Sequence, residues 1–119
     1  MHPDCTVYKT AQYLTKKWAL LVLFELYKGE DYTRRFSELK GSLGGITSKV
    51  LAQRLRELEE EGLVGRRVDA DHFPVKSEYF LTEAGLGLMD VVKHLKQWAL
   101  IYKIDNIDCA CQNCRECIL

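Results

Sequence analysis

The sequence lacks the features that mark an enzyme, a secreted protein or a membrane protein. It has no glycine-rich phosphate loop, no metalloprotease motif and no GxSxG motif, and its three histidines are scattered. The first ten residues contain no apolar segment typical of a signal peptide. The most apolar run, 18–26, is too short to span a bilayer and contains Glu25. We therefore expect a soluble cytoplasmic protein, not an enzyme and without a membrane partner.

The chain also has no excess of either charge. Its formal net charge of zero argues against a nonspecific polycation. Residues 1–56 nevertheless carry ten Lys and Arg against five Asp and Glu, whereas residues 57–119 carry seven against twelve. This asymmetry fits a basic surface that faces a polyanion, although charges scattered on a solvated surface would also produce it. With 119 residues, 47% of them hydrophobic, the chain is expected to form one packed domain.

Hydrophobic periodicity and helix-capping residues predict a mainly α fold with a small β-hairpin. The expected elements are a helix over 7–14, an apolar central helix over 17–28, a polar loop over 30–35, a helix over 36–43, a turn at Gly44-Gly45, a helix from Thr47 or Ser48 to about Glu61, strands over 63–68 and 76–81, and a helix over 83–103 capped by Thr82. We expect one domain over residues 1–104 and a cysteine-rich tail over 105–119.

This order of elements predicts a winged helix-turn-helix. Two helices joined by a glycine-containing turn form a helix-turn-helix, in which the second helix reads DNA. The hairpin that follows directly would be the wing. No single element is specific for this fold, but the order, the short lengths and the basic N-terminal half together favour it.

The helix that begins near Thr47 has two distinct sides. A helical wheel places Leu51, Leu55 and Leu58 in one narrow arc, which we expect to face the core. The first three turns expose polar and basic residues instead: Ser48, Lys49, Gln53 and Arg56. The last turn is acidic, and because phosphates repel carboxylates, this end is expected to lie off the DNA.

Side-chain chemistry suggests a role for each exposed residue. Gln53 can pair bidentately with adenine, and Lys49 or Arg56 can donate to N7 and O6 of guanine. Thr47 and Ser48 can contact phosphate or cap the helix, and capping is expected of one of them.

Further basic residues lie beside the helix or on the wing. Arg54 is at the edge of the buried arc and could bond a phosphate or pair with a glutamate. Arg66, Arg67, His72 and Lys76 lie on or near the hairpin and are expected to contact phosphate or the minor groove. Neighbouring strand residues point to opposite faces, so at most one of Arg66 and Arg67 is expected to reach DNA.

The last long helix carries an apolar stripe at three- and four-residue spacing. Its members are Leu88, Val91, Val92, Leu95, Trp98, Ala99 and Tyr102. The stripe could pack on the domain's own helices, but one small domain cannot easily cover both it and the apolar central helix. We therefore expect a homodimer interface here.

The residues described so far resemble the HxlR family of winged-helix regulators, which is close to the MarR group. The resemblance rests on KWALLVLFEL, RRFSELKGSLGGITSKVLAQRLRELEEEGLVGRRV and PVKSEYFLTEAG, and it covers nearly all of residues 5–100. It implies a homodimeric DNA-binding transcription factor whose first and last helices form the dimer. It also implies that one reading helix of each subunit enters the major groove.

The resemblance carries over to particular positions. The residues that match the family's reading-helix pattern are Lys49, Gln53, Arg54 and Arg56, and Lys76 stands where the family often has a wing arginine. Cys5, 13 residues before Trp18, matches a family cysteine that senses oxidants or electrophiles in some members. A lone cysteine before a helix is also commonly a small buried hydrophobe. The chain departs from the family at Thr15-Lys16, where Gly-Gly is usual.

Four cysteines crowd the tail, which is a second departure from the family. Cys109, Cys111, Cys114 and Cys117 follow the pattern C-x-C-x2-C-x2-C. Four thiolates this close can hold a soft metal, but the spacing matches neither paired zinc knuckles nor the full ferredoxin pattern. Zinc, an iron–sulfur cluster, thiol–disulfide switching and a tail of free thiols are all open.

The sequence as a whole predicts a homodimeric transcriptional regulator that binds a pseudo-palindromic operator in double-stranded DNA. Its cysteines make it a candidate for redox or metal response. The alternatives are a winged-helix adaptor that binds proteins and a cysteine-based redox protein.

Overall fold

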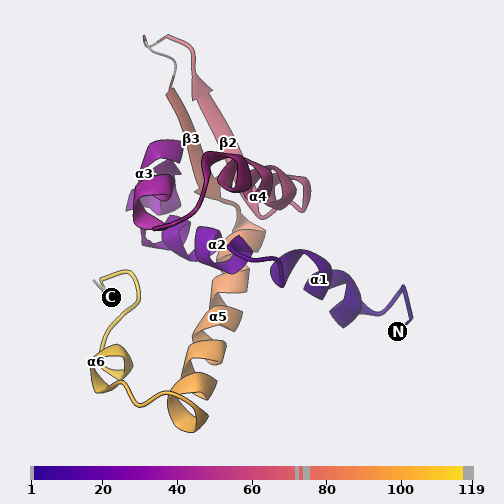
Figure 1. Cartoon of the computed structure of the whole chain (residues 1–119), viewed down its shortest axis with the longest axis vertical. Coiled ribbons are helices and arrows are strands. Elements are labelled where there is room, and N and C mark those ends of the chain that lie inside the picture. Colours follow the sequence, from indigo (N-terminus) through magenta and orange to yellow (C-terminus); the bar gives the residue numbers. More distant parts are fainter. Residues whose placement is uncertain (1, 72, 74–75, 117–119) are drawn as a thin grey trace.

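The computed structural model describes residues 2–71, 73 and 76–116. The elements are α1 (Thr6–Leu14), α2 (Ala19–Lys28), a 3-10 turn η1 (Glu30–Tyr32), β1 (Thr33–Arg35), α3 (Phe36–Ser42), α4 (Ser48–Glu60), β2 (Val64–Asp69), β3 (Lys76–Leu81), α5 (Glu83–Tyr102) and α6 (Ile107–Ala110). The chain therefore folds as a winged helix-turn-helix, in the order that the sequence predicts. Figure 1 shows the β2–β3 hairpin projecting beyond α3 and α4 as a wing.

The sheet has three strands, so the prediction of a hairpin alone was incomplete. β1 pairs with β3 on the side opposite β2, which gives the antiparallel order β1-β3-β2. Residues 30–35 were expected to form a loop. Only Thr33–Arg35 form the extra strand, and three residues are too few to show the alternation by which a strand is recognised.

The core lies between α2, α4 and the sheet. Val22, Leu23 and Leu26 of α2 are fully buried. The predicted inward arc of α4 is confirmed, because Leu51 is 0% exposed and Leu55 is 1% exposed. Contacts between α2 and α4 thus fix the position of the second helix of the helix-turn-helix.

The central helix begins two residues later than predicted. Trp18 has φ 79°, in the left-handed region, and α2 starts only at Ala19. A left-handed residue cannot continue a right-handed helix, and this conformation is uncommon for a bulky side chain. The indole of Trp18 is partly buried against the core, so the residue at which the helix is interrupted is also one that packs on the core.

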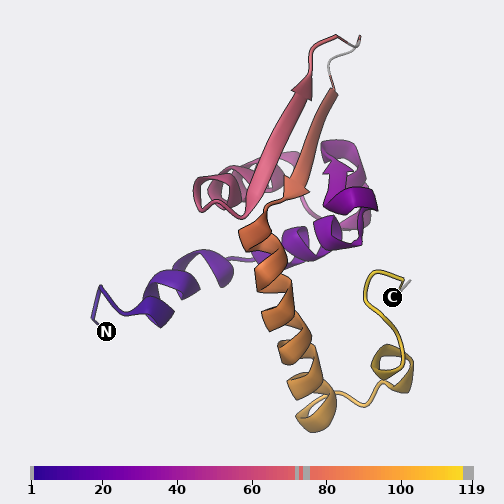
Figure 2. The same cartoon turned by 180° about the vertical axis from the view of Figure 1, so that it is seen from behind.

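Two helices extend away from the core. Figures 1 and 2 show α1 and α5 projecting from the body in different directions. Among the described residues, those of α1 include none that is buried, and α5 buries only Gly85 and Met89. The exposed large apolar side chains on these two helices are Val7, Tyr8, Val91, Leu95, Trp98, Ile101 and Tyr102.

The tail turns back toward the body after α5. Figure 2 shows the chain returning from the far end of α5 through α6 toward the helices of the domain. Cys114 packs against the core cluster, which places the described part of the tail on the domain surface. Across the described residues, we find no helix with the length and apolar character needed to cross a membrane.

The first turn of α5 leaves no room for a side chain at Gly85. A Cβ atom there would collide with the carbonyl oxygen of Leu63. We expect Gly85→Ala to lower the free energy of unfolding by about 1–3 kcal/mol, because the clash is with backbone. Urea denaturation followed by circular dichroism measures this change.

Gly87 provides the matched control. It is exposed in the same helix, and a Cβ there would meet no atom of the described residues within 4 Å. Gly87→Ala should instead raise stability by about 0.5–1 kcal/mol, since alanine favours helix. Equal effects of the two substitutions would contradict the proposed close packing of α5.

Candidate nucleic-acid interface

The turn between α3 and α4 sets the angle at which α4 begins. Gly45 in this turn has φ 91°, which favours glycine. Thr47 is the N-cap, and its hydroxyl accepts a hydrogen bond from the Val50 N–H at 3.2 Å. Of the two residues considered for capping, Thr47 therefore caps and Ser48 is the first helical residue. The hydroxyl of Ser48 lies at an exposed helix start.

The outward side of α4 consists of the residues selected from the sequence. Ser48, Lys49, Gln53 and Arg56 are all exposed, on the side of the helix away from the buried leucines. The first turn contains no acidic residue. Its unpaired N–H groups and Lys49 therefore form a surface suited to an anion. The Gln53 amide donates to Glu57 Oε1 at 3.2 Å, a bond it would have to leave to reach a base.

Arg54 links α4 to the segment that precedes α2. Its Nε donates to the Lys17 carbonyl at 2.9 Å, and its Nη1 donates to Glu57 Oε1 at 3.2 Å. Of the two roles considered for Arg54, pairing with a glutamate is the one seen in this structure. The sequence pattern did not point to the bond with Lys17, since the two residues are 37 positions apart.

Glu57 is the acceptor at the centre of this link. Its Oε1 lies 3.3 Å from Lys16 Nζ as well as 3.2 Å from Arg54 Nη1. Burial acts to raise the pKa of Glu57, but the contacts with Lys16, Arg54 and Gln53 outweigh it, and the pKa lies below its ordinary value. The carboxylate is therefore ionised at neutral pH and joins α4 to the end of α1.

The two arginines of β2 point to opposite faces of the wing, as predicted. The Arg66 guanidinium lies 5.8 Å from the centroid of the Tyr79 ring and donates to Ser77 Oγ at 3.1 Å. The Arg67 guanidinium lies 4.4 Å from the centroid of the Phe80 ring. Both side chains are exposed, so both are available to a ligand.

Of the two remaining predicted wing residues, only Lys76 is described. Lys76 begins β3 and is partly buried, opposite Asp69 in the sheet register. His72 falls outside the described residues.

The sequence reasoning missed a third arginine beside the wing. Arg35 ends β1, and the register places Glu78 of β3 between Arg35 on one side and Arg67 on the other. Arg35 is exposed, and its backbone N–H donates to Glu38 Oε1 at 3.0 Å at the start of α3. The only sequence signal was the Arg34-Arg35 pair, which a predicted loop could not place on the sheet.

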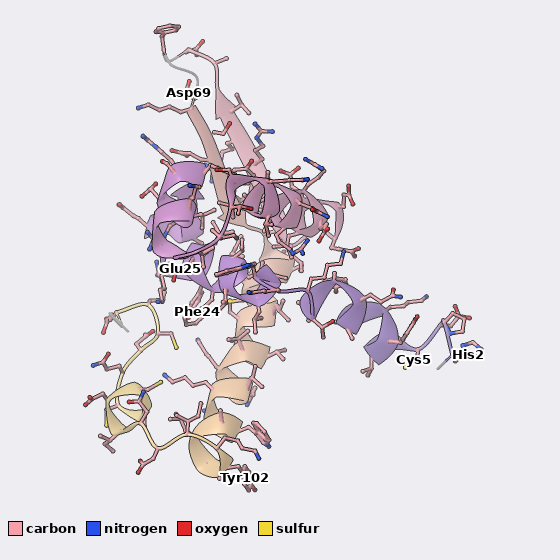
Figure 3. The ribbon with its side chains drawn as sticks, in the orientation of Figure 1. His2, Cys5, Phe24, Glu25, Asp69 and Tyr102 are labelled. Atoms are coloured by element: carbon pink, nitrogen blue, oxygen red, sulfur yellow. The ribbon has the colours of Figure 1, made fainter. Side chains whose placement is uncertain are left out.

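The cysteines lie in two separate places. Cys5 is the N-cap residue of α1, is partly buried and makes no side-chain capping bond. Figure 3 shows Cys5 at the outer end of α1, on the other side of the molecule from the tail. The four cysteines of the described part, Cys5, Cys109, Cys111 and Cys114, are free thiols.

The structure contains no preformed metal site within its described residues. There, no group of three or more His, Cys, Asp or Glu side chains is placed to hold a metal ion. Cys117, the fourth predicted ligand, lies outside the described residues. Zinc or an iron–sulfur cluster at the four tail cysteines therefore stays a prediction of the sequence.

The loss of stability caused by removing the Glu57 carboxylate should depend on pH. The folded-state pKa of Glu57 is lowered from 4.5, so its contribution is fully present above pH 4.5 and is lost as pH falls through the lowered value. We expect Glu57→Gln to have a lower melting temperature than the wild type at pH 7 and the difference to shrink below pH 4.5. Calorimetry across this range measures it.

Glu60→Gln is the control for charge alone. Glu60 is exposed in the same helix, and no ion pair of the described residues involves it. A pH-dependent loss in Glu60→Gln as large as that in Glu57→Gln would contradict a specific role for the Lys16–Glu57–Arg54 contacts.

Comparison with known proteins agrees with this geometry. The family described as HxlR-like helix-turn-helix matches residues 13–106. The uncharacterized HTH-type transcriptional regulator YvaP of Bacillus subtilis is 38% identical over 91 residues, which are 76% of this chain and 81% of that protein.

Solved structures of two redox-linked regulators are also similar. Reduced YodB from B. subtilis has a TM-score of 0.74 and 33% identity, over 89% of this chain and 98% of that one. The redox regulator HypR in its reduced form has a TM-score of 0.71 and 34% identity, over 80% of this chain and 90% of that one. Diamide-treated YodB and oxidised HypR match as well. The chain therefore belongs to the HxlR-like family of helix-turn-helix proteins, and it is a transcriptional regulator, not an enzyme.

Proposed function

We propose that the protein is a homodimeric transcriptional regulator that binds a specific sequence in double-stranded DNA through α4. The observation that carries this proposal is that exposed basic and polar residues, buried leucines and acidic residues occupy different parts of α4. Its first three turns expose Lys49, Gln53 and Arg56 to solvent, while its leucines are buried and its acids gather at the other end. The major groove of DNA can accept the N-terminal half of a helix of this kind.

Each exposed group has a partner on DNA that suits its chemistry. Gln53 presents an amide to adenine, and Lys49 and Arg56 present donors to the N7 and O6 atoms of guanine. Ser48 and the first N–H groups of α4 suit a phosphate. We assign Arg54 a positioning role, since its donors already bind Lys17 and Glu57.

The wing is proposed to contact the flanking DNA. Arg66 and Arg67 are exposed on its two faces, and Lys76 begins β3. His72, which lies outside the described residues, is kept as a candidate contact from the sequence alone. One face of the hairpin is expected to meet phosphate or the minor groove, so one of the two arginines contributes. Arg35 lies on the same face as Arg67, on the other side of Glu78.

The dimer is proposed to form through α1 and α5. Leu95 and Trp98 of α5 are each 50% exposed, and Val91 is 59% exposed, in a row along one side of the helix. A contiguous apolar row of this kind marks an interaction surface, and a second copy of the chain is the partner it suits. Two α4 helices related by two-fold symmetry would then read half-sites about one helical turn, or a multiple of it, apart.

A redox response is proposed as the means of regulation. The similar proteins YodB and HypR have each been solved in a reduced and a treated or oxidised form. In this chain, Cys5 and the tail cysteines are free thiols in the described residues. An adaptor that binds only proteins would leave the acid-free start of α4 unexplained.

Lys49→Ala should weaken specific DNA binding by roughly 1–3 kcal/mol, because one base contact is lost. The measurement is a gel-shift titration with a fragment of the gene's own promoter region, at several salt concentrations. Wild-type affinity should fall steeply with salt, since counterions are released from phosphate.

Lys103→Ala is the matched control, because it removes the same charge from an exposed position just after α5. Its affinity should stay close to that of the wild type. No retardation of any genomic fragment at low salt would contradict DNA binding and favour the adaptor.

Leu95→Glu should weaken the dimer by roughly 2 kcal/mol or more, because it places a charge in the centre of the apolar row. Sedimentation velocity measures the shift from dimer to monomer. Gln97→Glu adds the same charge at an exposed position of α5 outside the row and should leave the dimer intact. A wild-type chain that sediments as a monomer would contradict this part of the proposal.

A further inference from the structure

The tail closes a small apolar cavity between α2 and α5. The cavity has a volume of about 280 Å³, and Phe24 of α2 and Val92 of α5 form part of its wall. Lys96, Cys109 and Cys114 line it from the α5 and tail side. Figure 3 labels Phe24, which marks the place where α2 meets the returning tail. Two thiols and the side chains of Lys28 and Lys96 therefore border the same apolar space.

Lys96 contacts the tail at two atoms. Its Nζ donates to Cys114 Sγ at 3.5 Å and to the Gln112 carbonyl at 3.1 Å. Cys109 lines the same cavity as Lys96 and Cys114. Burial acts to lower the pKa of Lys96, but the contacts with Cys114 and Cys109 outweigh it, and the pKa lies above its ordinary value. The hydrogen bond with Cys114 places the Lys96 ammonium group beside Cys114 Sγ at the wall of the cavity.

Both thiols are held by ordered backbone. Cys109 lies in α6, where its N–H donates to the Asn106 side chain at 3.1 Å. Cys114 precedes Arg115, whose guanidinium donates to the Tyr27 carbonyl at 3.0 Å and to the Gly29 carbonyl at 2.9 Å. The same guanidinium lies 4.4 Å from the centroid of a tyrosine ring in η1. The tail is thus fastened to the end of α2 on one side and to α5 on the other.

Cys111 differs from these two cysteines although it lies between them in sequence. It is exposed, whereas Cys109 and Cys114 are partly buried. It is not among the residues that line the cavity, and Lys96 makes no contact with it in the described structure. Of the three tail cysteines that the structure describes, Cys109 and Cys114 therefore share the cavity and Cys111 does not.

We infer that Cys109 and Cys114 form a dithiol–disulfide couple that small uncharged organic disulfides oxidise at this cavity. The uncharged, small reagent follows from the apolar wall and the volume of the cavity. Lys96 acts as the positioning residue that holds Cys114 Sγ at the cavity.

The reaction is thiol–disulfide exchange in two steps. The Cys114 thiolate attacks one sulfur of the reagent, forms a mixed disulfide and releases the first reagent thiolate. The Cys109 thiolate then attacks Cys114 Sγ, forms the Cys109–Cys114 bond and releases the second reagent thiolate. The two protons lost by the cysteines pass through solvent to the two released thiolates. Two protein thiols are oxidised, one reagent disulfide is reduced to two thiols, and Lys96 stays protonated.

The consequence for DNA binding rests on the proposed function. The new bond would join α6 to the turn before Arg115, and these segments lie between α5 and the end of α2. α2 packs directly against α4. A change in the tail would therefore alter the placement of α4 relative to the dimer helix α5, and with it the spacing of the two reading helices.

The first test maps the disulfide without DNA. The full chain, purified reduced without oxygen, is treated with bis(2-hydroxyethyl) disulfide, and its peptides are analysed by mass spectrometry without reduction. We expect a Cys109–Cys114 link, formed equally in Cys111→Ser. Cys109→Ser should trap the hydroxyethylthio adduct on Cys114. A link that includes Cys111, an unmodified Cys114, or a stoichiometric metal bound by the reduced tail would overturn the assignment.

The second test isolates Lys96. Lys96→Gln should slow modification of Cys114 about tenfold, since the hydrogen bond that holds Cys114 Sγ at the cavity is lost. Lys103→Gln removes an exposed charge just after α5 and should react like the wild type. Equal rates in the two variants would overturn the role of Lys96.

The third test compares DNA binding by the reduced and the disulfide forms in a gel shift. We expect the affinities to differ about fivefold or more, the lower end of common allosteric couplings. If the disulfide forms and the affinities are equal, regulation by this site is overturned. If neither form binds DNA while the disulfide maps as expected, the thiol site stands and the proposed function fails.

Discussion

The burial of one leucine row in α4 is the constraint on which the rest of the structure depends. Leu51, Leu55 and Leu58 are at most 1% exposed, and α4 packs with this row against α2 and the sheet. A helix has 3.6 residues per turn, so fixing one arc also fixes the opposite one. The exposure of Lys49 and Gln53 is therefore a consequence of core packing. The same hydrophobic contact that stabilises the domain determines which side chains a ligand meets.

A domain of this size cannot bury every apolar surface that its helices carry. Its core is formed by α2, α3 and the turn after it, α4, the sheet and the first turns of α5, and little of the chain is left to cover α1 or the outer side of α5. The apolar row around Trp98 is thus exposed because the domain is too small to cover it. If a second copy of the chain covers this row, as we propose, it also sets the distance between two α4 helices, and dimer formation and recognition of DNA would then share one geometric cause.

The features that were predictable from the sequence depend on local physics. Helix caps at Thr47 and Thr82, the inward arc of α4 and the opposite faces of Arg66 and Arg67 follow from capping and periodicity alone. The features that were missed depend on contacts between distant segments. Arg54 bonds a carbonyl 37 residues away, and β1 forms only because the edge of β3 is available to three residues with no pattern of their own. Composition could group the tail cysteines but could not distinguish among them.

The described part of the tail is held by carbonyl groups at the end of α2. The last carbonyls of a helix need donors, and Arg115 supplies two from a position 86–88 residues further along the chain. Lys96 makes the second attachment, this time from α5. Because the tail is fastened at two points that belong to different helices, it cannot change its own length or curvature without acting on both. A covalent bond within the tail, as proposed above, would therefore act on α4 through α2, since α2 packs against α4.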